Sequence, residues 1–251
     1  MQHTNLELPI LLVLICFLLL CFWRLRVKKL KEYHSDILGL IEIWKKYNGE
    51  KLLTINKYHH GISTDDKSIT RSYWYFIAQQ VLNHIKDKKQ SEVLFFGLGA
   101  NTSSRIINDQ NPQAHQTIIE IDQSIIEACR EFFHLDEMKN VTIIKDDAYK
   151  LIDQKPDFKH KFDVIIVDIF TGIPPYVSTK TNQPPFIEKL LKWSKIDGRV
   201  IFNRPANIQK DRKDTKKLSK YLKLKFKEVK IVYIKDRRGY QNDIITASII
   251  L

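Results

Sequence analysis

The stretch that most constrains the fold of this chain runs from residue 92 to residue 122. It opens with an apolar run, 93–96, of the kind that forms a strand. Gly97 and Gly99 follow directly, and glycine allows a sharp turn and leaves room for a ligand beside the backbone. The pattern is therefore typical of a strand that ends in a glycine turn at a binding site.

A helix and a second strand are expected after this turn. The helix is predicted over 102–108, with Thr102 or Ser103 as its N-terminal cap. The second strand, 117–121, carries Glu120, which lies 23 positions after the first glycine of the turn. A carboxylate at this distance, at the carboxyl end of the second strand, can accept hydrogen bonds from two ribose hydroxyls. The spacing therefore indicates a bound nucleoside.

Strand and helix patterns alternate over the rest of the chain. The further strands are expected at 141–144, 162–167, 199–203, 229–234 and 244–250, and the helices at 71–86, 123–133, 186–194 and 210–226. A turn around 237–240 joins the last two strands, which are therefore expected to pair antiparallel. Seven strands with intervening helices predict an α/β fold with a Rossmann-like sheet, in a domain that spans 71–251.

Polar residues stand at the ends of several of these strands. Besides the glycine turn and Glu120, Asp147 follows the third strand and Asp168 follows the fourth. In an open α/β sheet, ligands bind beyond the carboxyl ends of the strands, near the point where the strand order reverses. Glycines can also simply permit a turn, and an acid after a strand can cap the next helix. Together, however, the four features favour one binding site.

The N-terminal segment is apolar. Residues 8–23 carry no charge. Arg24 and Arg26 follow directly, and three lysines then lie within residues 28–31. A cleavable signal peptide carries its positive charge first, so an uncleaved transmembrane anchor over 1–31 is expected. The positive flank predicts a single-pass protein of the plasma or inner membrane, with the main domain in the cytoplasm and lipid as a partner of the helix.

Residues 32–70 are expected to connect this anchor to the main domain. A short helical linker is predicted over 32–47, followed by a small hairpin unit over 51–69. His59 and His60 are neighbours, and on a strand they would point to opposite faces, so no metal pair is expected there. The three cysteines show no metal-binding or disulfide spacing.

The formal net charge of +12 suggests an anionic partner, either lipid or nucleic acid. Lysines and an arginine gather in the helix predicted over 210–226. Asp211 and Asp214 dilute this run, and no aromatic platform accompanies it. A solvated helix face is therefore the preferred interpretation, and nucleic acid is not an expected partner.

The strand-end motifs resemble those of the spermidine/spermine synthase family, the polyamine aminopropyltransferases, which have the class I AdoMet-dependent methyltransferase fold. The resemblance covers roughly residues 72–203. The matching segments are the glycine motif at 97–101, the family's V-E-I-D at 119–122, its D-A pair at 147–148 and its Y-D-V-I-I-V-D at 162–168. It implies a seven-stranded methyltransferase-type sheet with a small N-terminal β unit, and it is compatible with a homodimer.

The resemblance also implies roles for individual residues. AdoMet or decarboxylated AdoMet would be the co-substrate, held by Glu120 at the ribose and by the residues of the glycine turn and the D-A pair, which are Gly97, Gly99, Asn101, Asp147 and Ala148. Asp168 would take a proton from the attacking amine, and Tyr75 would line the same cleft. The loop 169–185 is expected to close over the site.

Several positions depart from the family pattern. The aspartate of the family's glycine motif is Ala100 here, and its last glycine is Asn101, which tolerates left-handed backbone geometry. The family's Y-H-E occupies 75–77 without its His and Glu, and its second acid is Thr171. Each charge of a diamine needs a partner when it leaves water. The nucleoside half of the site is therefore better preserved than the amine half.

Four functions remain compatible with these patterns. The first is an aminopropyl or methyl transferase with an unidentified acceptor. An NAD-type dehydrogenase would also use a glycine turn and Glu120, although the antiparallel last strands and the acids at 147 and 168 argue against it. The third is a catalytically inactive nucleoside-binding module, favoured by the missing amine ligands, and the fourth is nucleic-acid binding through the basic helix.

Overall fold

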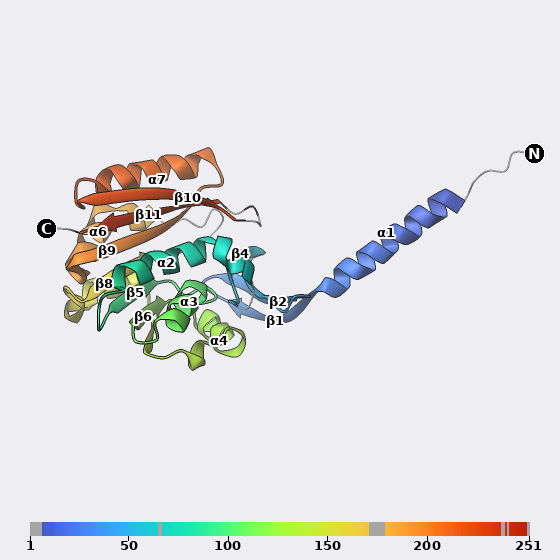
Figure 1. Cartoon of the computed structure of the whole chain (residues 1–251), viewed down its shortest axis with the longest axis horizontal. Coiled ribbons are helices and arrows are strands. Elements are labelled where there is room, and N and C mark those ends of the chain that lie inside the picture. The colour runs from blue at the N-terminus through green and yellow to red at the C-terminus, as the bar shows by residue number, and fades with distance from the viewer. Residues whose placement is uncertain (1–6, 65–66, 171–178, 237–238, 240, 250–251) are drawn as a thin grey trace, which may run out of the picture.

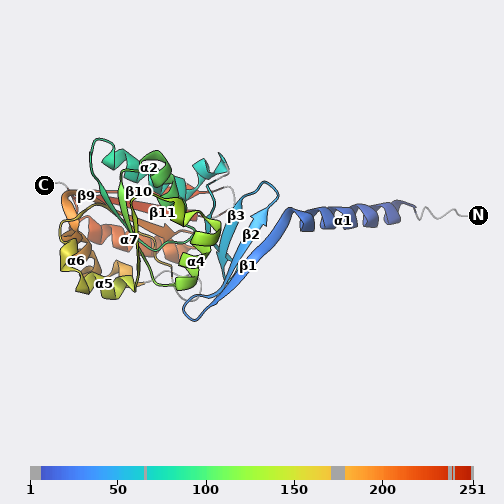
Figure 2. The ribbon, with the colours of Figure 1, turned by 90° about the horizontal axis from the view of Figure 1, so that it is seen from below.

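A computed structural model describes residues 7–64, 67–170, 179–236, 239 and 241–249. The chain forms a four-stranded and a seven-stranded sheet, preceded by helix α1 (Glu7–Arg26). In both views α1 projects away from the rest of the molecule (Figures 1 and 2). Among the described residues, no helix combines the length and the apolarity that a membrane crossing requires, so the expected spanning helix is not supported.

The small sheet is an antiparallel meander. Its strands are β1 (Val27–Ser35), β2 (Gly39–Lys46), β3 (Lys51–Ile55) and β4 (Tyr58–Ile62). The hairpin expected within 51–69 is thus confirmed as β3 and β4, whereas the helical linker predicted over 32–47 is wrong, because this segment forms β1 and β2. Ile41 and Ile43 are both fully buried, at the two-residue spacing of a strand, and Gly39 turns at a φ of +83°.

The large sheet has the strand order β10-β11-β9-β8-β5-β6-β7. Its strands are β5 (Glu92–Phe96), β6 (His115–Glu120), β7 (Val141–Lys145), β8 (Phe162–Val167), β9 (Ser194–Pro205), β10 (Glu228–Lys235) and β11 (Gln241–Ser248). Strands β5 to β9 run parallel, and β11 runs antiparallel to both of its neighbours, which confirms the expected pairing of the last two strands. All strands of a typical dinucleotide-binding sheet run parallel, so the antiparallel direction of β11 disfavours the dehydrogenase alternative.

Helices cover both faces of this sheet. They are α2 (Tyr73–Ile85), α3 (Thr102–Gln110), α4 (Gln123–Phe132), α5 (Ala148–Gln154), α6 (Pro184–Trp193) and α7 (Gln209–Leu222). Val93 and Phe95 of β5 belong to one apolar core with α2, α3, α4 and the small sheet. Leu94 and Phe96 alternate with them and belong to a second core with α5, α6 and α7. Because β5 lies between β6 and β8, the strand order reverses at the end of β5.

The small sheet docks on the turn that follows β5. A Cβ atom added to Gly61 of β4 would lie 2.3 Å from the Cβ atom of Ala100, and one added to Gly99 would lie 2.5 Å from the carbonyl oxygen of His60. The hydroxyl of Thr102 accepts a hydrogen bond from the Ile62 amide at 3.1 Å and donates one to the Ile62 carbonyl at 2.7 Å. The two segments therefore approach so closely that neither glycine has room for a Cβ atom, and the Thr102 side chain bridges them.

Substituting Gly61→Ala tests this contact. The added methyl group would overlap Ala100, so we expect the free energy of unfolding to fall by about 1–3 kcal/mol, measured by urea denaturation. The double variant Gly61→Ala/Ala100→Gly removes the opposing methyl group and should recover part of the loss. Wild-type stability in the single variant would contradict the close packing described above.

Candidate functional site

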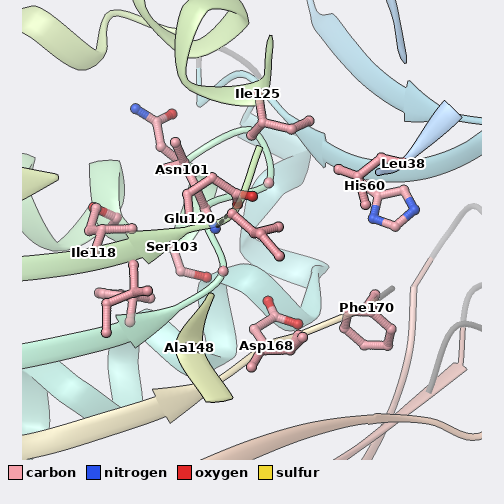
Figure 3. A pocket seen from close by; sticks show the side chains of 18 of the residues that line it. Leu38, His60, Asn101, Ser103, Ile118, Glu120, Ile125, Ala148, Asp168 and Phe170 are labelled. Atoms are coloured by element: carbon pink, nitrogen blue, oxygen red, sulfur yellow. Dashed lines mark hydrogen bonds between the residues drawn. The ribbon is translucent and has the colours of Figure 1, made fainter. Parts of the chain in front are cut away.

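A cavity of about 250 Å³ opens at the carboxyl ends of the central parallel strands. Seven of the eight predicted site residues border it: Gly97, Gly99, Asn101, Glu120, Asp147, Ala148 and Asp168. In Figure 3 the carboxyl groups of Glu120 and Asp168 both point into this space. The strand ends therefore bring these residues together at the switch point, where an open α/β sheet binds its ligands.

The glycine turn borders the cavity with bare backbone. Gly97 has a φ of +95°, and a Cβ atom there would lie 2.4 Å from the carbonyl oxygen of Asp168. Asn101 also has a positive φ, +48°, and stands at the N-terminus of α3. The predicted caps of this helix are wrong, because the hydroxyl of Thr102 bonds to β4 and that of Ser103 donates to the Trp74 carbonyl at 3.0 Å.

Glu120 is buried at the end of β6. Its Oε2 accepts the Leu98 amide at 2.9 Å, and its Oε1 accepts the Asp122 amide at 2.9 Å. Burial raises the pKa of Glu120, and these backbone donors partly offset the rise. A carboxylate oxygen can accept more than one hydrogen bond, so this fixed carboxyl group retains acceptor capacity toward a ligand hydroxyl.

Asp147 and Ala148 follow β7. The Asp147 carboxylate accepts the Tyr149 amide at 2.9 Å and thereby caps α5. The helix-capping role that the sequence also allowed is thus present, and Asp147 borders the cavity at the same time. Ala148 is buried and small, which keeps this end of the cavity open.

Asp168 follows β8 and is held by a chain of amides that sequence reasoning missed. Asn203 of β9 donates a hydrogen bond to the Asp168 carboxylate at 2.7 Å, and Asn242 of β11 donates one to the side-chain amide oxygen of Asn203 at 2.8 Å. Asp168 keeps some exposure to the cavity, but protein surrounds its other sides. This burial raises the pKa of Asp168 to about 6, although the hydrogen bond from Asn203 by itself lowers the pKa. A signal did exist, because Asn203 ends a predicted strand at the same sheet edge.

Tyr75 does not border the cavity. It lies half-buried in the first turn of α2, where its amide donates to the Ser72 cap at 3.2 Å, and the neighbouring Tyr73 and Trp74 face the cavity instead. A helix turns by about 100° per residue, so matching a motif by distance along the chain does not fix which side chain points inward. Thr171 and the rest of the segment 171–178, within the loop 169–185, lie outside the described residues.

The small sheet supplies a wall that sequence reasoning also missed. Leu38, from the β1–β2 turn, and His60, from β4, border the cavity, and Phe170 lies edge-on to the His60 ring at 6.4 Å between centroids (Figure 3). Burial, together with the neighbouring His59, lowers the pKa of His60 to about 4. His60 is therefore a neutral side chain at neutral pH.

Solved structures share this architecture. A probable spermidine synthase from Corynebacterium glutamicum ATCC 13032 aligns with a TM-score of 0.70 and 21% identity, over 88% of this chain and 79% of the other. Thermotoga maritima spermidine synthase aligns with a TM-score of 0.67 and 18% identity, over 89% of this chain and 72% of the other. Human methyltransferase-like protein 13, solved in complex with SAH, aligns with a TM-score of 0.59 and 19% identity, over 69% of this chain and 79% of the other. At these identities the likeness shows the methyltransferase-type fold.

Curated relatives match shorter stretches. The polyamine aminopropyltransferase of Vibrio vulnificus is 24% identical over 117 residues, which are 46% of this chain and 39% of that protein. An eEF1A lysine and N-terminal methyltransferase homolog of Drosophila melanogaster is 26% identical over 88 residues, 35% of this chain and 13% of that protein. The chain thus matches about two fifths or less of the length of these relatives.

A family model gives broader coverage than either curated relative. It describes the spermine/spermidine synthase domain and matches residues 75–249, which include β5 to β11 and the residues after β5, β6, β7 and β8 that border the cavity. The chain therefore belongs to the spermine/spermidine synthase family.

Proposed function

We propose that this protein binds an adenosyl sulfonium, AdoMet or decarboxylated AdoMet, and transfers an alkyl group from it to an amine or related nucleophile. The observation that carries the proposal is that Glu120 and Asp168 border one cavity beside a glycine turn that has no space for side chains. Two structural neighbours support it: a spermidine synthase solved with the transition-state analogue AdoDATO, and the human protein solved with SAH.

The residues present fit such a ligand. The sugar would lie beside the backbone of the glycine turn, which borders the cavity at Gly97 and Gly99, and Glu120 would accept bonds from the ribose hydroxyls. Asp147, beside the small Ala148, would lie at the adenine amino group. Ser104 also borders the cavity, and its buried hydroxyl has no hydrogen-bond partner in the described structure.

The chemistry requires little of the protein beyond positioning and one proton transfer. When bound, a sulfonium activates the adjacent carbon toward attack. The new bond joins the acceptor nitrogen to that carbon, the carbon–sulfur bond breaks with its electron pair staying on sulfur, and the nitrogen loses a proton. Asp168 would accept that proton, and a pKa near 6 makes it a stronger base than an ordinary aspartate.

Methyl transfer is the second candidate. The Drosophila relative named as a methyltransferase homolog and the human structural neighbour both favour it. Mass spectrometry after incubation with an amine panel separates the two, because aminopropyl transfer leaves methylthioadenosine and methyl transfer leaves S-adenosylhomocysteine. Nucleoside binding without either product would favour the catalytically inactive module.

Glu120→Ala should weaken the binding of AdoMet, decarboxylated AdoMet or methylthioadenosine by about tenfold or more, because it removes charge-assisted hydrogen bonds to the ribose. Isothermal calorimetry measures the change. Glu120→Gln keeps the size of the side chain and separates loss of charge from collapse of the glycine turn. Glu127→Ala, an exposed acid on the adjacent α4, is the matched control and should bind normally. Absence of heat with all three ligands in the wild-type protein would refute the proposal.

Asp168→Asn should stabilise the fold while abolishing transfer. The folded pKa of about 6 lies above the ordinary value, so the contribution of Asp168 to stability is fullest below pH 4 and is lost as the pH rises through 6. An uncharged amide avoids that loss and can still accept the Asn203 bond. We expect a gain of about 1–3 kcal/mol in unfolding free energy, larger at pH 8 than at pH 5.

Denaturation of this variant at several pH values provides the measurement. Asp197→Asn is the control, because hydrogen bonding to Lys88 lowers the pKa of Asp197 and this substitution should give no gain. A pH-independent difference between Asp168→Asn and the wild type would contradict the assignment of a raised pKa.

We also propose that lipid contacts α1, with the α/β domain on the cytoplasmic side. The helix leaves apolar side chains such as Val13 and Phe17 largely exposed. Replacing both with aspartate should reduce co-sedimentation of the full chain with phosphatidylglycerol vesicles several-fold, because it removes apolar surface and adds negative charge. Leu224→Asp, at another exposed apolar position, is the control. Equal sedimentation of the double variant and the wild type would exclude lipid contact through α1.

A further inference from the structure

The carboxylates that border the cavity stand at the ends of different strands of the large sheet. Glu120 ends β6, Asp146 and Asp147 follow β7, and Asp168 follows β8, with β5 between β8 and β6. Neighbouring strands lie about 4.8 Å apart, so the end of β8 lies roughly 10 Å from that of β6 and roughly 14 Å from that of β7. Asp168 is therefore apart from the other three.

The other three carboxylates already bind nearby backbone amides. Glu120 accepts the amides of Leu98 and Asp122, Asp146 accepts that of Asp147 at 2.7 Å, and Asp147 accepts that of Tyr149. All of them lie on the side of the glycine turn assigned above to the nucleoside. Among the described lining residues, this leaves Asp168 as the carboxylate of the acceptor side.

Neutral and apolar groups surround Asp168 on that side. Phe170 lies beside it in Figure 3, and the His60 ring lies edge-on to Phe170. His60 is uncharged at neutral pH, as its lowered pKa indicates. The lysine of the described lining, Lys180, adds a positive charge to the same cavity. The acceptor side thus offers one negative charge and apolar walls.

This environment discriminates between acceptors by their charge. An ammonium group that leaves water needs a carboxylate or an equivalent partner, and an apolar stem needs none. A diamine would place one ammonium at Asp168 and its second against the neutral His60 or Phe170. We propose that the acceptor carries a single amino group on an apolar stem and that the site discriminates against diamines. This inference rests on the proposed function and specifies its substrate class.

A free alkylamine and a lysine side chain share this chemistry. The test therefore uses three acceptors with the full-length protein saturated with methylthioadenosine: n-butylamine, 1,4-diaminobutane and Nα-acetyl-lysine methylamide. The first two differ by one terminal ammonium. Calorimetry should show n-butylamine binding at least fivefold more tightly than 1,4-diaminobutane. The relative affinity of the lysine derivative identifies the source of the amine, either a free metabolite or a protein side chain.

A pair of variants tests the physical reason. Phe170→Glu adds a second carboxylate beside Asp168 on the acceptor side, and Phe170→Gln has the same size without the charge. The Glu variant should raise the affinity for 1,4-diaminobutane at least fivefold over the Gln variant while leaving n-butylamine within about twofold. Methylthioadenosine affinity reports whether each variant keeps the site intact.

The outcomes separate the two proposals. Tighter binding of 1,4-diaminobutane than of n-butylamine by the wild-type protein overturns the inference and leaves the proposed function in place. Binding of methylthioadenosine without any of the three amines has the same consequence. Failure to bind methylthioadenosine, AdoMet or decarboxylated AdoMet removes the proposed function, and the inference about the acceptor with it.

Discussion

The backbone contact between β4 and the glycine turn is the constraint on which both parts of the molecule depend. Gly61 and Gly99 allow the two segments to approach more closely than any side chain would permit, and Thr102 bonds to both backbone groups of Ile62. The same turn borders the cavity. Docking of the small sheet and the shape of the candidate nucleoside site are therefore set by one geometry, which also brings His60 to the cavity.

The two aspartates of β8 show how the environment separates a structural acid from a candidate catalytic one. Burial alone would raise the pKa of Asp163, but ion pairs with Lys195 and Lys88 at 2.7 and 2.6 Å outweigh it and lower the pKa. At the other end of the strand, Asp168 has one amide partner and its pKa rises to about 6. The desolvated carboxylate of Asp168 thus lowers stability at neutral pH, as is common for residues at functional sites.

Most of the large sheet could be predicted from the sequence because its strands are continuous apolar runs with polar ends, and β8 matches the predicted 162–167 in full. Local patterns were insufficient where distant contacts decide the structure. Residues 32–47 have apolar positions at a helical spacing, yet pairing with β3 makes them strands. Tyr75 matches a family motif by spacing, but the orientation of α2 turns it away from the cavity. The partners of Asp168 and the wall from the small sheet come from distant segments.

The small sheet is fastened to the Glu120 side of the candidate site at the N-terminus of α4. The Ser35 hydroxyl bonds to the Asp122 carboxylate and thereby holds the hairpin that carries Leu38, while the Asp122 amide donates to Glu120. Tyr33 adds a bond to Glu131 of α4 at 2.9 Å. The hairpin that carries Leu38 is therefore fastened to the residue whose amide holds the Glu120 carboxylate. A change in the small sheet that released Asp122 would therefore loosen both the Glu120 carboxylate and the N-terminus of α4, which Asp122 caps.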